Sequence, residues 1–249
     1  SGNPLPTPIV LTAAATTQPS GTSNPLDSLE EYEGMRVTVP SLTVTGSTQG
    51  TITEPSATVF STGVFIGVIT GVPRPFREAG IAISDTLPAG APGTIPRFDE
   101  NPERIRVDSD AQPGATTIDV TAGTIVTNIT GPLDYAFRCY TIDPDAATPP
   151  SVGAQPGSVP VPAATSDELT VASFNMERFF DTVNDPGISD PVLTTAAFNR
   201  RVAKASLIVR TVQRYPDVIG VQEMENLTTL QAVAAQINND AVTLDGLPN

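Results

Sequence analysis

Histidine is absent from this chain of 249 residues, and cysteine occurs once, at Cys139. The absence of histidine removes the commonest general base and the commonest metal ligand of proteins. A single cysteine excludes an intrachain disulfide, a cysteine zinc cluster and a CxxC redox pair. The chain therefore has neither the imidazole chemistry nor the thiol chemistry on which many enzymes depend.

Positive charge is also scarce. Thirteen Lys and Arg residues stand against 27 Asp and Glu residues, the formal net charge is −14, and twelve of the thirteen cations are Arg. Proteins that bind nucleic acid through its phosphates usually present a basic surface. Because the chain as a whole repels a polyanion, any nucleic-acid chemistry would depend on a local cation cluster or on bound metal ions.

Long apolar runs and tryptophan are missing as well. No segment approaches the ~18 consecutive apolar residues of a membrane span, so we expect no such span. The 25 Pro and 19 Gly residues exclude a helical bundle and favour short strands, turns and loops. No charged-then-apolar leader begins the chain, so any signal peptide is expected to have been removed already. Few cysteines together with abundant Thr, Ser, Ala, Pro and Gly suit a secreted bacterial protein.

The composition divides the chain into four stretches. Residues 1–26 are uncharged and rich in Pro, Thr and Ser, which predicts a linker or extended arm. Residues 27–145 contain short alternating segments, which predict a β-rich domain, either a small antiparallel barrel or a sandwich. Residues 146–167 are rich in Pro, Ala and Gly and are interpreted as an interdomain linker. Residues 168–249 alternate strand and helix patterns.

Seven strands are expected in the β-rich domain, separated by turn formers such as Pro113-Gly114 and Gly131-Pro132. They are residues 36–46, Thr58–Phe60, Val64–Thr70, Ile105–Val107, Thr116–Val120, Ile125–Thr130 and Tyr135–Ile142.

The last stretch predicts a β–α–β–α order. The segment LTVASFNMERFF carries small or apolar residues on both faces, as in a strand buried inside a layered fold. A helix with its apolar residues at helical spacing follows, capped by Thr194 or Thr195 and ended by Pro216. A short apolar strand leads to a second helix capped by Asn226. Two strands cannot cover both helices, so we expect an incomplete α/β domain and a truncated sequence.

Two segments of this stretch carry a family resemblance. Ser173-Phe174-Asn175 ends the first strand, and the second strand runs from Pro216 through Gln222-Glu223. The pair resembles the endonuclease/exonuclease/phosphatase superfamily, whose members are metal-dependent phosphodiesterases on a four-layered α/β sandwich. The wider pattern FNMERFFD…NRRVAKA…PDVIGVQEMEN is similar to the secreted extracellular nuclease branch. The resemblance implies that Asn175 is catalytic, that Glu223 binds Mg²⁺ (or Mn²⁺ or Ca²⁺), and that Gln222 helps to order the site.

Elementary chemistry agrees with these roles. Mg²⁺ takes oxygen ligands, commonly one or two carboxylates together with phosphate and water, so one Glu at a rigid strand end suffices to seat it. The Asn175 amide can orient a phosphate oxygen without adding charge. Neighbouring strands that end at one sheet edge place both residues in one crevice. Taken alone, an Asn at a strand end is a turn former and a Glu after a strand is a solvated loop residue, and Glu177 and Glu225 are assigned to the latter class.

The chain also departs from the family. The catalytic His pair, the Asp-x-Asn segment and the final Asp-His of the superfamily have no counterpart here, since no His is present. Without a base to activate water and an acid to assist the leaving group, we expect residues 1–249 alone to be inactive.

A second resemblance lies in the β-rich domain. The segment Tyr32–Val37 (YEGMRV) is similar to the start of the oligonucleotide/oligosaccharide-binding (OB) barrel that precedes the nuclease domain in secreted nucleases. Such barrels bind single strands through stacked aromatics and a basic groove. Arg74 and Arg77 are the candidate nucleic-acid contacts, although ion pairs with Glu78 and Asp85 would explain them equally well.

Two functional hypotheses follow. The chain is the leading part of a secreted, divalent-metal-dependent nuclease or phosphodiesterase acting on DNA or RNA, or it is a non-catalytic extracellular β-domain that binds a ligand or acts as a spacer. Oligomeric state and the choice between DNA and RNA are not encoded in these motifs.

Overall fold

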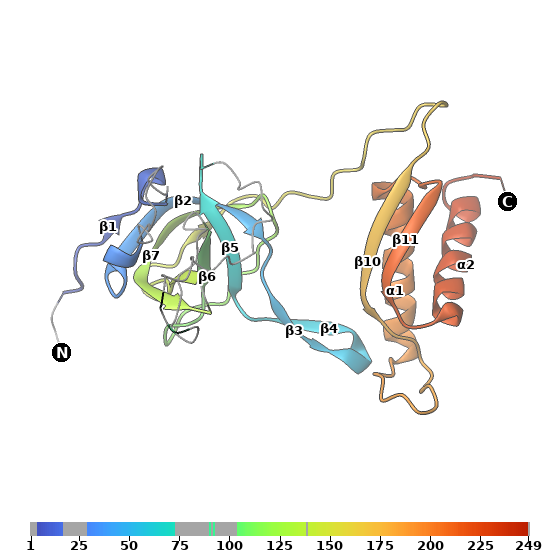
Figure 1. Ribbon diagram of the computed structural model, residues 1–249, viewed down its shortest axis with the longest axis horizontal. Coiled ribbons are helices and arrows are strands. Elements are labelled where there is room, and N and C mark those ends of the chain that lie inside the picture. The colour runs from blue at the N-terminus through green and yellow to red at the C-terminus, as the bar shows by residue number, and fades with distance from the viewer. Residues whose placement is uncertain are drawn as a thin grey trace. The chain divides into compact units, whose positions relative to one another are not determined.

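The computed structural model describes residues 4–16, 29–72, 90, 92, 104–137 and 139–248. The chain forms two compact units. The first consists of Ser1–Thr51 and Ser61–Pro156, and the second of Ile52–Phe60 and Gly157–Asn249. Figure 1 shows a β-barrel in the first unit and a pair of strands flanked by two helices in the second.

A closed barrel of five strands forms the first unit. Strand β2 pairs with β5 and β7, β5 pairs with β6, and β8 lies between β6 and β7, which closes the ring. Because β8 returns from β7 in a hairpin and sits beside β6, the β6–β8 pair is parallel while the others are antiparallel. The structure thus resolves the predicted alternatives as a barrel, and the barrel is mixed where a purely antiparallel one was expected. The five strands are β2 (Arg36–Gly46), β5 (Val64–Ile69), β6 (Ile105–Asp108), β7 (Ile125–Ala136) and β8 (Cys139–Ile142).

The N-terminal arm contributes to the barrel. Strand β1 (Ile9–Val10) pairs in parallel with β2, and Leu11 is only 1 % exposed in the core. Strand β9 (Ser151–Val152) adds to β7 on the other side. The Arg36 guanidinium donates to the Pro6 carbonyl at 2.7 Å and to the Asp145 carboxylate at 2.6 Å, which ties both ends of the barrel segment together. Short 3₁₀ turns cover Ala13–Thr16 and Glu30–Tyr32.

The barrel interior is filled by aliphatic side chains with two aromatic ones. Alternate residues of β2 point inward, as the sequence predicted. The described hydrophobic residues of this unit that are no more than 1 % exposed are Leu11, Leu29, Val37, Val39, Leu42, Val44, Phe65, Ile105, Val107, Val126, Ile129, Leu133, Tyr140 and Ile142.

The Gly131-Pro132 pair lies inside β7, so the predicted turn there is wrong. A Cβ on Gly131 would lie 1.9 Å from the Asp143 carbonyl oxygen, so glycine permits the segment after β8 to cross closely. Strand β7 consequently continues past the predicted end at Thr130 to Ala136, and the predicted strand Tyr135–Ile142 is divided between the end of β7 and β8. Strand β8 then begins at Cys139, which pairs with Ala136.

The predicted strand Thr116–Val120 has no ladder of backbone hydrogen bonds among the described residues. Side-chain hydroxyls bind it: the Ile118 N–H donates to Ser109 Oγ at 2.9 Å and the Val120 N–H to Thr48 Oγ1 at 2.8 Å. Hydroxyl groups therefore take the place of a partner strand for most of this segment.

The second unit follows the predicted β–α–β–α order. Strand β10 (Val171–Phe179) pairs in parallel with β11 (Val218–Met224). Helix α1 (Thr195–Leu207) continues as a π-helical turn (Ile208–Val212), and α2 is Leu227–Thr243. The predicted caps are confirmed, because the Thr194 side chain accepts from the Ala197 N–H and the Asn226 side chain from the Thr229 N–H.

Most of a hairpin that lies between two barrel strands in the sequence, residues Ile52–Phe60, belongs to this second unit. Strands β3 (Gly50–Thr53) and β4 (Thr58–Ser61) form it around a 3₁₀ turn at Glu54–Ser56. The Thr194 N–H donates to the Pro55 carbonyl at 2.8 Å, which holds the turn beside the start of α1.

The two-stranded sheet is covered on one face within the described residues. Side chains of β10 and the helices form a small core of Met176, Phe179, Val202, Ala205 and Val233. On the opposite face Val171 is 71 % and Val218 52 % exposed. The expectation that β10 is buried on both faces is therefore wrong for this structure, since the only described helices of the unit pack on one side.

None of the helices in the described part of the chain is long and apolar enough to cross a bilayer.

A pH dependence is predicted for the barrel. Burial raises the pKa of Asp143 to about 6, and the carboxylates of Asp108 and Asp134 add to the effect while Arg106 opposes it. Because the folded carboxyl binds its proton more tightly than the unfolded one, this contribution to stability is complete below pH 3.8 and is lost as the pH rises through about 6.

The Asp143→Asn variant removes this titration. We expect it to be more stable than the wild type by about 1–2 kcal/mol at pH 7.5 and nearly equal at pH 4, since one pKa unit corresponds to about 1.4 kcal/mol and the group keeps some solvent. Urea denaturation followed by tyrosine fluorescence at both pH values measures the difference. An equal gain in stability at both pH values would contradict the raised pKa of Asp143.

The close crossing at Gly131 is tested by Gly131→Ala. The added methyl group has to displace backbone, so we expect a loss of about 2–4 kcal/mol in the free energy of unfolding. Gly157→Ala is the matched control, because a Cβ there meets nothing within 4 Å. Urea denaturation of both variants measures the two losses in stability. Equal stability of the two variants would show that the crossing is not tight.

Candidate functional site

Asn175 and Glu223 lie side by side near the carboxyl ends of β10 and β11. The strands are parallel neighbours, and Asn175 is opposite Gln222 in their register. Asn175 Nδ2 donates a hydrogen bond of 3.0 Å to Glu223 Oε1. The structure thus brings together the two residues that the sequence singled out, on adjacent strands at one edge.

A bulge in β10 shapes this edge. Between the Asn175–Gln222 and Phe179–Met224 pairs the register shifts, because β10 has more residues than β11 there. Glu177, Arg178 and Glu223 adopt φ values of 51°, 50° and 58°, a left-handed conformation that side-chain-bearing residues rarely take. Such strain is concentrated at functional sites of proteins.

The bulge aims backbone donors at the two side chains. The Arg178 N–H donates to Glu223 Oε2 at 2.9 Å, and the Glu177 N–H donates to Asn175 Oδ1 at 2.7 Å. Each of these acceptors is therefore held in one orientation. The Arg178 side chain turns away and pairs with Glu54 of the hairpin, Nε to Oε1, at 2.5 Å.

These contacts keep Glu223 ionised. The Asn175 amide, the Arg178 N–H and the Arg178 charge lower the pKa of Glu223, against a smaller effect of burial. The side chain is exposed, so each oxygen keeps a lone pair available after accepting one hydrogen bond. One carboxylate completed by water and substrate phosphate is a common Mg²⁺ environment, and Mn²⁺ and Ca²⁺ also take oxygen ligands. The donor set fits a divalent cation.

Gln222 makes a different set of contacts. Its Nε2 donates to the Gly220 carbonyl at 3.1 Å, and its Oε1 accepts from Ser173 Oγ at 3.3 Å. Within the described part of the chain no hydrogen bond links it to Glu223. The structure therefore places this predicted supporting residue beside the site but joins it to the strands rather than to the carboxylate.

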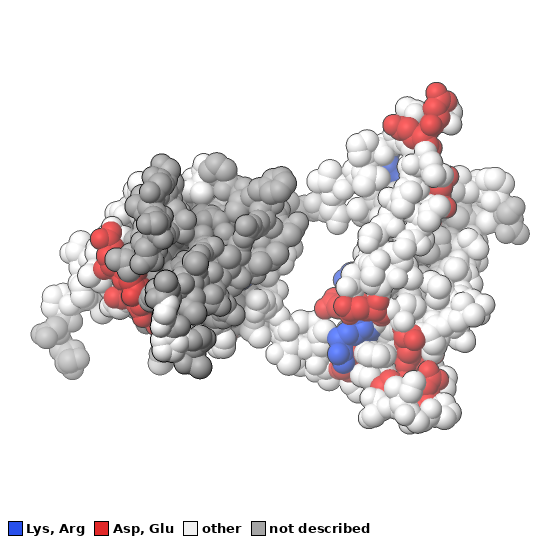
Figure 2. Space-filling model, in the orientation of Figure 1, with Lys and Arg blue, Asp and Glu red and all other residues white. Residues whose placement is uncertain are grey.

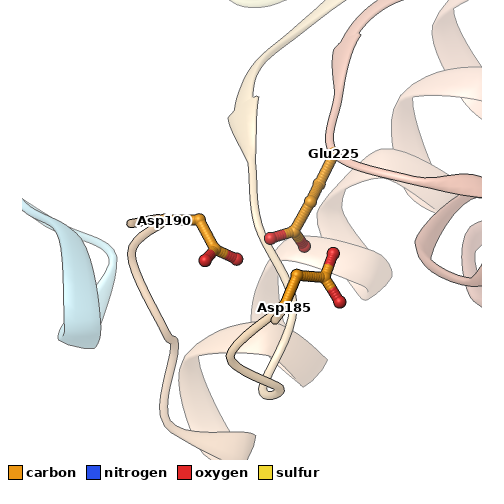
Figure 3. A group of neighbouring side chains, drawn as sticks. All are labelled: Asp185, Asp190 and Glu225. Carbon is orange, nitrogen blue, oxygen red and sulfur yellow. The ribbon is translucent and has the colours of Figure 1, made fainter. Parts of the chain in front are cut away.

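A second acidic group was missed from the sequence. Asp185 and Asp190 follow β10, Glu225 follows β11, and one oxygen from each lies within 4.8 Å of the others (Figure 3). Glu225 is half-buried, where a solvated loop residue was expected. The sequence does contain a signal for this group, because acidic residues follow the carboxyl ends of two strands that are parallel and so end at one sheet edge.

Burial controls the charge of this group. It raises the pKa of Glu225 to about 7, the neighbouring Asp190 carboxyl adds to that rise, and Glu225 in turn lowers the pKa of Asp190. The two carboxyls thus share a proton near neutral pH, which limits their repulsion. Both Asp190 carboxylate oxygens and Glu225 Oε1 are shielded from solvent.

Cations gather on the other side of β10. Figure 2 shows Lys and Arg atoms next to acidic ones on this unit. Arg201 donates to the Met176 carbonyl at 3.1 Å and also to the Glu177 carbonyl, and its guanidinium lies 4.8 Å from the centre of the Phe179 ring. This residue braces the bulge from α1. The candidate contacts Arg74 and Arg77 lie outside the described residues.

The barrel region matches a known protein family. Residues 10–154 match a protein-family model described as "Domain of unknown function (DUF8508)", and this match does not extend to β10 or β11. No curated protein matches the chain, and no solved structure matches it. Since the model covers more than half of the sequence, the chain belongs to the DUF8508 family.

Proposed function

We propose that the second unit supplies the metal-binding part of the site of a secreted, divalent-metal-dependent phosphodiesterase that acts on nucleic acid. The observation that carries the proposal is the hydrogen bond of 3.0 Å between Asn175 and Glu223 at a strained bulge. An exposed carboxylate kept ionised and oriented by two donors is suited to bind a cation. The resemblance around Ser173–Asn175 and Gln222–Glu223 supports the substrate class.

Each residue has a distinct task in this proposal. Glu223 holds the cation, and the Arg178 N–H fixes the direction of its second oxygen. Asn175 orients the carboxylate and lies where its amide can meet a phosphate oxygen. A bound divalent cation would supply charge neutralisation at the phosphate and a more acidic water. The described residues bind and orient, and no imidazole is present to move protons.

Glu223→Gln tests the metal site. The change preserves the shape and one acceptor but removes the anionic oxygen, so we expect Mn²⁺ and Mg²⁺ affinity to fall about tenfold or more. Isothermal titration of the full chain with each ion measures this. Glu168→Gln is the matched control, because it makes the same charge change beyond the opposite end of β10 and should leave affinity unchanged.

The acidic group is the alternative place where the ion could bind. If Glu223→Gln leaves metal binding intact while Glu225→Gln abolishes it, the ion sits among Asp185, Asp190 and Glu225 and the proposal is wrong. If both variants bind as the wild type does, the unit has no metal site at either place.

Asn175→Ala tests the orienting amide. Its loss removes the largest influence that lowers the pKa of Glu223, so that pKa should rise towards its ordinary value. Protons then compete with metal at higher pH, and the midpoint of Mn²⁺ binding against pH should move upward while affinity at pH 8 changes little. Titration from about pH 2.5 to pH 8 measures the midpoint, which lies below the ordinary pKa of 4.5 in the wild type. An unchanged midpoint, with a folded variant, would show that Asn175 does not tune this carboxylate.

A further inference from the structure

A cleft of about 440 Å³ lies in the second unit, along β10, α1 and the β3–β4 hairpin. Its apolar lining includes Ile52, Val59 and Phe174, and its polar lining includes Asn175. The volume is in the range of sites that hold small organic groups. Asn175 lines the cleft and also contacts Glu223, which itself lies outside the lining, so this one residue links the cleft to the candidate metal site.

Two cations of α1 line the same cleft. Arg200 and Lys204 are four residues apart, so they lie on one face of the helix. Arg200 donates to the Ser56 carbonyl at 3.0 Å and has donors to spare. Lys204 is exposed and is the single lysine of the sequence, and its side-chain ammonium makes no hydrogen bond or ion pair within the described residues.

Positive charge in this acidic unit is concentrated here. This unit has six cationic residues. Four of them lie at the bulge of β10 or in the cleft beside it, and the other two follow the carboxyl end of α1. The four are Arg178, Arg200, Arg201 and Lys204, and the two are Arg210 and Arg214. The sequence predicted that nucleic-acid chemistry on so acidic a chain would depend on a local cation cluster.

We propose that this cleft binds one nucleotide of a single-stranded nucleic acid, with the base on the apolar lining and the flanking phosphates on Lys204 and Arg200. The inference rests on the proposed function, since it places the next phosphodiester beside Asn175. Stacking of a base on an aromatic or apolar surface stabilises such complexes by about 1–3 kcal/mol per base. The Glu177 carboxylate in the lining can pair with a base edge, whereas a lipid acyl chain would offer it no partner.

The experiment measures binding of a fluorescent oligothymidylate to the full chain in EDTA, without metal. We expect Lys204→Gln to weaken binding about five- to tenfold. Two phosphate contacts predict a slope of log K against log salt of about −1.4, which falls to about −0.7 in the variant. Arg214→Gln makes the same charge change outside the cleft and should bind within twofold of the wild type.

Chemical labelling tests the position directly. An amine-selective reagent can modify only Lys204 and the N-terminal amine of this chain. Bound oligothymidylate should slow labelling at Lys204 about fivefold or more and leave the N-terminus unaffected, as peptide mass spectrometry would show. Inorganic phosphate at the same phosphate concentration should protect far less, because it has no base to stack.

Three outcomes would overturn the inference: equal loss of binding in Lys204→Gln and Arg214→Gln, full reactivity of Lys204 in the complex, or binding of anionic lipid vesicles in place of the oligonucleotide. Because EDTA is present, the result does not depend on Glu223. Protection of Lys204 without a metal site would contradict the proposed function alone, and a metal site without protection would contradict this inference alone.

Discussion

The hydrogen bond between Asn175 and Glu223 joins two parallel strands at the point where their register breaks, and the arrangement of the candidate site depends on it. The bulge gives β10 extra residues, which turns the Arg178 N–H towards the second oxygen of Glu223. Both oxygens of the exposed Glu223 carboxylate thereby accept a hydrogen bond that fixes their direction. An exposed glutamate normally samples many rotamers, so this pair of donors supplies the orientation that a cation site needs.

The bulge is itself braced from several elements. Arg201 of α1 donates to backbone carbonyls of the bulge and lies over the Phe179 ring, while Arg178 pairs with Glu54 of the hairpin. Desolvation lowers the pKa of Arg201, as expected for a cation used to satisfy partly buried carbonyls. The same bracing leaves Lys204, one turn further along α1, free for a ligand. The cation proposed to bind a ligand is thus separated along α1 from the cation that braces the bulge.

The two units bury their hydrophobic cores in different ways. The barrel closes on itself, so each of its five strands has two partners and the interior excludes solvent on all sides. The β10–β11 pair has helices on one face only among the described residues, and its other face exposes Val171 and Val218. Openness on that side leaves Asn175 and Glu223 accessible to a large substrate, at the cost of a core far smaller than that of the barrel.

Much of this protein was determined by local sequence. Period-two and helical patterns predicted most strands, both helices and the caps at Thr194 and Asn226, because these depend on residues near in the chain. Parallel strand order also predicted that Asn175 and Glu223 would meet. The tertiary structure decided what arises between distant segments: the crossing of Asp143 over Gly131, the parallel β6–β8 pair, and the proximity of Asp185 and Asp190 to Glu225. Each of these depends on the close approach of backbones or charges far apart in sequence, which periodicity does not encode.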